Sequence, residues 1–177
     1  ISLVDKTDKV SVSSFAGNLG TKLARNDYLP ISADPVSMLR VGELSKGRDF
    51  YDAQPLNPDK PPPSVTFIPV IRDVTLAGSD WRTVVATVNT DYFLNFYSNY
   101  IGPDIGIVDL LRYDGKLLLS TDESQKPGTI RRSSLDILAR VDTTEAGQFE
   151  ALGESGKAIL VAYRASRIYP LVLVVQL

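Results

Sequence analysis

One β-hairpin pattern occurs twice in the chain, and this repeat constrains the fold more than any other sequence feature. Apolar, turn, lysine and hydroxyl positions follow the same order in residues 1–14 and in residues 108–121, so that Leu3 corresponds to Leu110. The second copy turns at an Asp-Gly pair, residues 114–115, which is a strong signal for a tight hairpin. Solenoids need three or more short repeats. Two copies of this length therefore predict a duplicated α+β unit.

Each half of the chain also ends with two runs rich in Val, Ile and Leu, and such runs predict strands. They lie at residues 65–71 and 81–88 in the first half and at residues 158–163 and 169–175 in the second. We therefore predict an α+β fold of two units, residues 1–89 and 90–177, each an antiparallel sheet flanked by helices. A single continuous sheet through both halves would exclude this arrangement.

Two segments show the spacing of a helix. Five aromatic residues between positions 89 and 100 recur on one side of a helical pattern, namely Tyr92, Phe93, Phe96, Tyr97 and Tyr100. This spacing predicts a helix whose aromatic face is buried against the second sheet, with a cofactor-binding cluster as the alternative. Residues 133–141 predict a second helix, with Ser133 or Ser134 as its N-cap.

Other segments of the first half carry weaker signals. Residues 16–26 are compatible with a helix, and residues 39–44 with a short strand. Prolines crowd residues 55–63. Because proline lacks a backbone donor and fixes φ, we expect a surface loop there and not a domain linker.

The composition excludes several functional classes. The chain has no cysteine and no histidine, so disulfides, the usual zinc sites and a Ser-His-Asp triad are impossible. Its net charge of -2 argues against nucleic acid as a partner, because nucleic-acid binding needs a basic surface. The acidic residues show neither EF-hand spacing nor an evident catalytic pair. We therefore expect no enzyme, no catalytic residue, no metal and no cofactor.

The glycine-rich segment 153–158 superficially matches two catalytic motifs. A P-loop would need glycine at position 151 and a hydroxyl residue at position 158, and both positions hold alanine. A nucleophile elbow needs a histidine partner and a different spacing. The turn of a hairpin explains this segment.

The chain begins at Ile1 and contains no signal peptide, so we expect it to be a processed or excised piece of a longer protein. The apolar run at residues 171–175 is far shorter than the roughly 20 residues of a membrane helix. Any membrane anchor would lie outside this sequence.

A series of short motifs occurs in an order that resembles a known family. They are Asn26–Leu29, Arg40–Glu43, Val84–Val88 followed by Asp91–Phe93, and the hairpin Leu110–Leu118. Together they resemble the double Cache domain, the extracytoplasmic sensor of bacterial transmembrane signalling receptors. Each motif is loose by itself, and their order over nearly the whole chain carries the resemblance.

The resemblance implies two tandem PAS-like units, a membrane-distal one at residues 1–89 and a membrane-proximal one at residues 90–177. It also implies a location on the periplasmic or extracellular face of the inner membrane, within a membrane-anchored parent. The parent would carry a cytoplasmic diguanylate cyclase, phosphodiesterase or histidine kinase domain. Members of the family usually form homodimers through a long N-terminal helix, which this sequence lacks.

The family binds small molecules mostly in the membrane-distal unit. By position, the candidate ligand-binding residues are Tyr28, Arg48, Phe50, Tyr51, Arg72 and Asp73. Arginine offers a fork of donors that suits a carboxylate, so the ligand is expected to be a carboxylate. Amino-acid-binding members carry an Asp where this chain has Asn89, and an Arg-x-Trp-Tyr segment that is missing here. The resemblance therefore does not imply an ordinary amino-acid ligand.

Two functions from different classes remain open at this point. The first is a sensor whose ligand binds the first unit and shifts an equilibrium between two states. The second is a module without a ligand, which dimerises or binds a partner protein, for example through the loop at 55–63. A buried Arg72 would favour the sensor, and a first unit filled with apolar side chains would favour the module.

Overall fold

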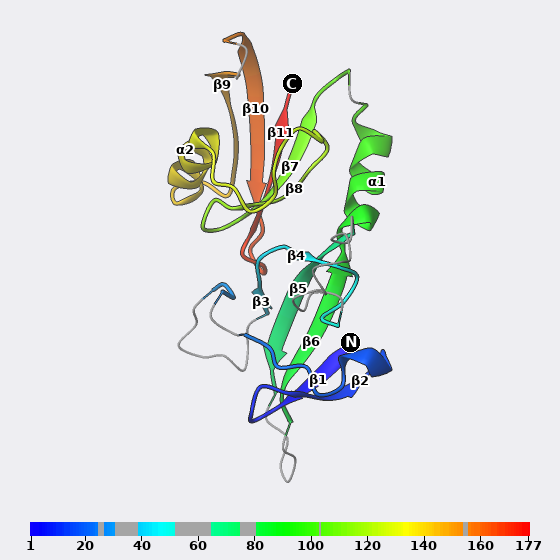
Figure 1. The fold of residues 1–177 in the computed structure, drawn as a ribbon. Helices are drawn as coiled ribbons and strands as arrows, with labels where there is room; N and C mark the ends of the chain where they lie inside the picture. Colours follow the sequence, from blue (N-terminus) through cyan, green and yellow to red (C-terminus); the bar gives the residue numbers. More distant parts are fainter. Residues whose placement is uncertain (25–26, 31–38, 52–64, 75–80, 103, 154–155) are drawn as a thin grey trace. The chain divides into compact units, whose positions relative to one another are not determined.

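The computed structural model describes residues 1–24, 27–30, 39–51, 65–74, 81–102, 104–153 and 156–177 (Figure 1). These residues form two compact units, Ile1–Asp91 and Tyr92–Leu177. Each unit is mostly β and contains one antiparallel sheet, and the two sheets are separate among the described strands. The proline-rich loop predicted at 55–63 lies outside the described residues.

The first unit has the strand order β2-β1-β6-β5-β3, with β4 also paired to β5. The strands are β1 (Ser2–Asp5), β2 (Val10–Ser13), β3 (Arg40–Val41), β4 (Ser45–Lys46), β5 (Thr66–Asp73) and β6 (Trp81–Asn89). The predicted hairpin is confirmed, with Leu3 opposite Val12. On its other side β1 pairs with β6, which places Leu3 opposite Val84. The first and last strands of the unit are thus neighbours.

A single carboxylate fixes the turn of this hairpin. Asp5 Oδ1 accepts hydrogen bonds from the Thr7 hydroxyl at 2.7 Å, from the Thr7 backbone N–H at 2.7 Å and from the Lys9 backbone N–H at 3.1 Å. These bonds, the one from the Thr7 hydroxyl above all, hold the pKa of Asp5 below its ordinary value. Asp8 adopts a φ of 64°, a left-handed conformation that a short polar side chain tolerates.

The second unit repeats the same strand order, β8-β7-β11-β10-β9. Its strands are β7 (Ile107–Arg112), β8 (Leu117–Ser120), β9 (Ala146–Leu152), β10 (Ala158–Ala165) and β11 (Leu171–Gln176). Leu110 lies opposite Leu119 in the hairpin and opposite Leu173 in the last strand. The glycine-rich segment that mimics catalytic motifs connects β9 to β10, which pair antiparallel, so its expected place in a hairpin is confirmed.

The Asp-Gly pair forms the turn of the second hairpin, as predicted. Gly115 has a φ of 83°, a left-handed conformation that glycine adopts without steric cost. Arg112 Nε donates to Asp114 Oδ1 at 3.0 Å, and a terminal nitrogen of Arg112 donates to Oδ2 at 2.6 Å. Although burial raises the pKa of Asp114, the hydrogen bond and charge of Arg112 hold it below its ordinary value overall.

Helices are few. The described residues contain a short 3₁₀ helix η1 (Ala16–Asn18) and the α-helices α1 (Thr90–Tyr100) and α2 (Arg132–Val141). The helix considered for residues 16–26 is therefore reduced to one turn in its described part. The predicted second helix is confirmed, but it begins at Arg132, and Arg131 occupies the N-cap position without a side-chain bond. Among the described residues no helix has the length and apolar character needed to cross a membrane.

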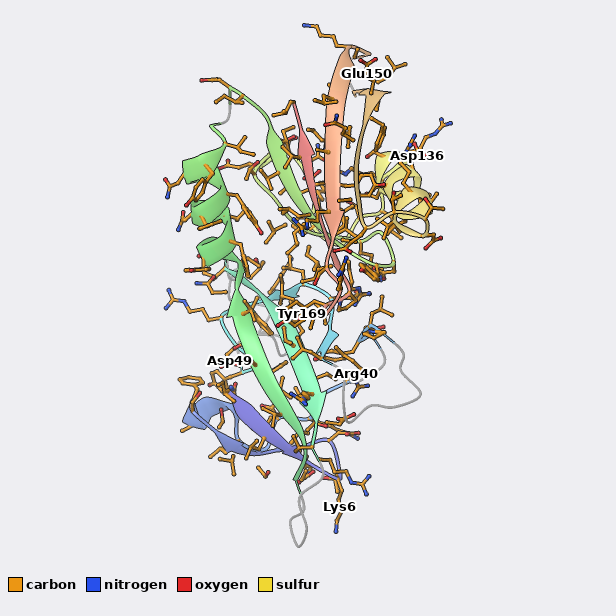
Figure 2. The ribbon with its side chains drawn as sticks, turned by 180° about the vertical axis from the view of Figure 1, so that it is seen from behind. Lys6, Arg40, Asp49, Asp136, Glu150 and Tyr169 are labelled. Carbon is orange, nitrogen blue, oxygen red and sulfur yellow. The ribbon has the colours of Figure 1, made fainter. Side chains whose placement is uncertain are left out.

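The prediction that α1 buries its whole aromatic face is wrong. Tyr92, Phe96 and Tyr100 are 70%, 47% and 74% exposed. Phe93 and Tyr97, on the neighbouring side of the helix, are half-buried, and burial raises the pKa of Tyr97. Figures 1 and 2 show α1 on the side of the second sheet away from α2. The aromatic residues span more of the helix surface than the sheet covers.

Each unit has a core on one face of its sheet. In the first unit it consists of Val4, Val10, Leu23, Tyr28, Phe50, Phe67, Ile71 and Val85. In the second it consists of Leu111, Leu117, Ile137, Val161, Tyr163, Ala165, Val172 and Val174. Burial of each large apolar side chain contributes about 1.5–3 kcal/mol. The two cores share no residue, which agrees with two units that each have their own hydrophobic centre.

We expect Leu117→Ala to destabilise the second unit by about 2–5 kcal/mol, because Leu117 is fully buried and the truncation leaves a cavity. The matched control is Leu152→Ala, since Leu152 is 78% exposed and should change stability by less than about 0.5 kcal/mol. Urea denaturation followed by far-ultraviolet circular dichroism measures both. Equal effects of the two substitutions would contradict this assignment of the core.

Candidate functional site

The first unit contains a cavity of about 640 Å³. Its walls come from residues 20–24, from Asp27 and Tyr28, and from Glu43, Ser45, Phe50 and Pro69. This volume lies within the range of about 300–1,000 Å³ that is usual for small-molecule sites. The cavity is therefore the candidate ligand-binding site, and it is called the first-unit pocket below.

The hairpin holds one wall of the first-unit pocket in place. The segment after η1 runs back along the turn, where Val10 N donates to Thr21 O at 2.9 Å and Leu23 N donates to Asp8 O at 2.9 Å. These backbone bonds bring residues 20–24 beside β2. The repeated hairpin therefore supports the site as well as the sheet.

A glycine lets the aromatic floor of the pocket lie close to the strand. Tyr28 and Phe50 are each 8% exposed, and Phe50 packs edge-on against Phe67 with ring centroids 5.3 Å apart. A Cβ atom at Gly42 would lie 2.7 Å from Pro69 Cγ and 2.8 Å from Tyr28 Cε1, so a larger residue would displace the tyrosine ring. Gly42 N also donates to Pro69 O at 2.8 Å, which fixes this segment beside β5.

Among the described residues that line the pocket, the charged side chains are mostly acidic. Lys22 carries a positive charge, while Asp27 and Glu43 carry negative ones, so these lining residues sum to one negative charge. Lys22 and Asp27 are exposed, and Glu43 is half-buried. An apolar floor with a charged margin can hold a small molecule that bears an ionic group.

The structure brings only two of the predicted site residues to this pocket, Tyr28 and Phe50. Arg48 lines a separate recess of about 360 Å³ together with Val65, Thr66, Asn89 and Asp91. Tyr51 is 56% exposed and packs edge-on against Phe15, with ring centroids 6.2 Å apart.

Arg72 and Asp73 lie on opposite faces of β5, because successive side chains of a strand alternate. Asp73 shares a face with the core residues Phe67 and Ile71, whereas Arg72 lies on the other face and is exposed. A buried Arg72, which would have supported the sensor hypothesis, is therefore not observed. The rival expectation of a first unit filled with apolar side chains is not observed either, since a cavity is present.

Asp73 takes part in a half-buried polar cluster that joins three strands. A terminal nitrogen of Arg40, labelled in Figure 2, donates to Asp73 Oδ2 at 2.5 Å. The hydroxyl of the buried Thr83 donates to Asp73 Oδ1 at 2.6 Å. Asp73 thus links β3, β5 and β6 and has a structural role independent of any ligand.

Asn89 likewise has a structural role in the second recess. Its Oδ1 accepts a hydrogen bond from the backbone N–H of Asp91 at 3.0 Å, at the start of α1. Beside it, the hydroxyls of Thr66 and the buried Thr90 lie 2.7 Å apart. The residue that replaces the expected carboxylate therefore anchors the beginning of a helix.

Sequence reasoning missed the charged residues of the first-unit pocket, Lys22, Asp27 and Glu43. Two of them stand inside motifs that the sequence already singled out, since Asp27 precedes Tyr28 and Glu43 follows Gly42. Each of these two acidic residues is the sequence neighbour of a residue that must approach the pocket, an aromatic residue in one case and a glycine in the other. This adjacency is the sequence signal that could have identified them.

No protein-family model matches the chain, and no curated protein matches its sequence. Solved structures do share its fold. The extracellular domain of a protein described as a histidine kinase is 20% identical, with a TM-score of 0.67, over 99% of this chain and 68% of the other. The ligand-binding domain of the Pseudomonas fluorescens chemoreceptor CtaA, in complex with L-serine, is 15% identical, with a TM-score of 0.57, over 99% and 70%.

A domain of a Vibrio parahaemolyticus protein described as a sensory box/GGDEF family member is similar as well. It is 18% identical, with a TM-score of 0.54, over 99% of this chain and 70% of the other. At these identities the likeness concerns the fold. The chain has the Cache-like fold of extracellular and periplasmic sensor domains, as the sequence motifs predicted.

We expect Asp73→Ala to destabilise the first unit by about 3–5 kcal/mol in the absence of any ligand, because Arg40 would keep a poorly solvated charge without its partner. Arg72→Ala is the matched control, because the exposed side chain of Arg72 lies on the other face of β5. This substitution should change the free energy of unfolding by less than about 0.5 kcal/mol. The chain has a single tryptophan, at position 81 in β6, so urea denaturation followed by fluorescence reports on this unit. A silent Asp73→Ala would refute the structural role.

Proposed function

We propose that the chain is an extracytoplasmic sensor domain whose small-molecule ligand binds in the first-unit pocket. The observation that carries this proposal is the cavity of about 640 Å³ with an aromatic floor and a charged margin. It occurs in a fold shared with receptor domains that were solved with L-serine and with L-Gln. We assign no catalytic activity to the domain itself.

The charges of the pocket favour a ligand that bears an ammonium group. Asp27 and Glu43 carry carboxylates that attract a cation, and the ammonium group of Lys22 can pair with an anionic group of the same molecule. The expectation of a carboxylate ligand depended on two arginines, but Arg48 lines another recess and Arg72 lies on the opposite face. An ammonium-bearing ligand, with or without a carboxylate, agrees better with the lining residues.

We further propose that the two units are tandem PAS-like modules with flanking helices, residues 1–89 distal and residues 90–177 proximal to a membrane. The identical strand order of the two sheets supports this. The intact receptor would be membrane-anchored and homodimeric, and would control a cytoplasmic cyclase, phosphodiesterase or kinase. Similarity to sensor domains of histidine kinases, chemoreceptors and GGDEF proteins supports a signalling role but does not select among outputs.

A second candidate function is a module that recognises a partner protein. Phe15, Leu19 and Tyr51 of the first unit are 50%, 53% and 56% exposed, and the rings of Phe15 and Tyr51 are in contact. Exposed aromatic residues that cluster are typical of protein interfaces. This surface does not line the first-unit pocket, so ligand binding and partner binding can be tested separately.

We expect a thermal-shift screen of the purified chain to give hits among amines and amino acids and none among simple carboxylates. A ligand that binds only the folded state stabilises it by about 2.7 kcal/mol at a hundredfold excess over its dissociation constant. Glu43→Gln should abolish the shift, because it removes a carboxylate from the pocket without changing its size.

Glu150→Gln is the matched control, because Glu150 is an exposed residue of β9 in the second unit, labelled in Figure 2. Its shift should equal that of the native chain. Hits among carboxylates alone, lost in Lys22→Gln, would overturn the ammonium class but keep the site. A screen without hits, combined with capture of a partner that Tyr51→Ser abolishes, would replace the sensor function with the second candidate.

A further inference from the structure

Helix α1 presents a row of aromatic residues that its own unit leaves exposed. Tyr92, Phe96 and Tyr100 are spaced four residues apart, so they form one ridge along the helix. Phe96 and Tyr100 have ring centroids 4.8 Å apart, and their neighbours Phe93 and Tyr97 are half-buried. The three exposed residues are called the α1 ridge below.

The size of the α1 ridge matches the apolar part of a protein interface. An aromatic side chain has about 150–250 Å² of surface. From the exposed fractions of the three ridge residues, their exposed surface together is roughly 400 Å². A standard interface buries about 800 Å² on each partner, of which about 56–65% is apolar. That apolar part is about 450–520 Å², so the ridge supplies most of the apolar area that one side of a stable dimer needs.

The charges of α1 indicate which partner fits. Asp91 is the one charged residue among the eleven of the helix, and α1 has no basic residue. Because lysine and arginine are missing, nothing on the helix attracts an anionic lipid surface or an acidic peptide. Two identical copies would meet without like-charge repulsion along the ridge. The helix therefore favours an uncharged partner surface, such as its own.

The spacing of the α1 ridge also suits a copy of itself. Rows of residues four apart are the ridges that interlock when two helices cross at about 50°, the commonest packing class in globular proteins. A twofold axis through such a contact pairs the same surface on both copies, and the central residue of the row lies next to the axis. In the α1 ridge that residue is Phe96.

We propose that the α1 ridge is a self-association surface, on which a second copy of the chain docks through the same three aromatic residues. The proposal does not depend on the first-unit pocket or on any ligand. Its failure would leave the proposed sensor function intact.

Sedimentation velocity over a concentration series tests the proposal on the purified chain. The native chain is expected to form a dimer, and Phe96→Glu should raise the dissociation constant about 30-fold or more, as the loss of an interface hot spot does. Tyr100→Glu provides a second variant, and Leu152→Glu is the control, because Leu152 is an exposed apolar residue of β9. Circular dichroism establishes that every variant is folded.

The absence of cysteine from the chain allows a direct test of the symmetry. Phe96→Cys introduces a single thiol next to the expected axis, where two copies bring their Cα atoms within the roughly 7 Å that a disulfide requires. Mild oxidation should crosslink this variant efficiently and leave Leu152→Cys uncrosslinked.

Three results would overturn the proposal. The native chain could sediment as a monomer at every concentration, or Leu152→Glu could dissociate a dimer that Phe96→Glu leaves intact. Alternatively, neutral phospholipid vesicles could bind the native chain but not Phe96→Glu while the chain in solution stays monomeric, which would assign the ridge to a membrane surface.

Discussion

The pairing of the first strand of each unit with its last strand is the constraint on which the rest of the fold depends. Leu3 lies opposite Val84 in one unit, and Leu110 lies opposite Leu173 in the other. These contacts join residues far apart in sequence, so their formation closes a long loop and costs conformational entropy. The cost is offset only when the closed sheet buries a face. Each sheet therefore needs a cover, which the segment between its second and third strands in chain order must supply.

Both units carry an arginine–aspartate pair on the face of the sheet that bears the core. Arg40 contacts Asp73 in the first unit, and Arg131 contacts the buried Asp109 in the second. Gln176 of β11 also donates to Asp109 Oδ2, at 2.6 Å, so this aspartate ties the last strand to the start of α2. A slip of one residue would move the carboxylate to the other face and leave its partner unpaired. Such pairs specify register more than they add stability.

The sheets and hairpins could be predicted because they depend on local patterns. Strand alternation and the turn at residues 114–115 determine where β7 and β8 lie, whatever the rest of the chain does. The exposure of α1 could not be predicted in this way, because it depends on how much of the helix surface the sheet covers.

The candidate site was only partly predictable for a similar reason. Tyr28 and Phe50 are apolar enough that burial at the pocket floor is favourable. For a charged residue on a strand, however, the strand register determines on which face of the sheet its side chain lies. Arg72 and Asp73 are neighbours on one strand, so alternation alone allows at most one of them to face the pocket side. Asp73, the one that does, is already engaged by Arg40. The charges that line the pocket come instead from loop positions, whose placement depends on the hairpin behind them.

The two units share a strand order but differ in what covers the core face, and this difference explains why the candidate site lies in the first. In the second unit α2 places Ile137 on that face, 2% exposed, among the core residues of β7, β10 and β11. Arg140 of the same helix stacks over Phe149, 4.0 Å from the ring centroid. In the first unit the described cover consists of residues 20–24 and 27–28, which follow one turn of 3₁₀ helix and leave a cavity above Tyr28 and Phe50. An amphipathic helix fills the face that it covers, whereas a loop held at its edge by backbone bonds leaves room for a ligand. The duplicated sheet is thus a common scaffold, and the element laid over it determines whether a unit is filled or can bind.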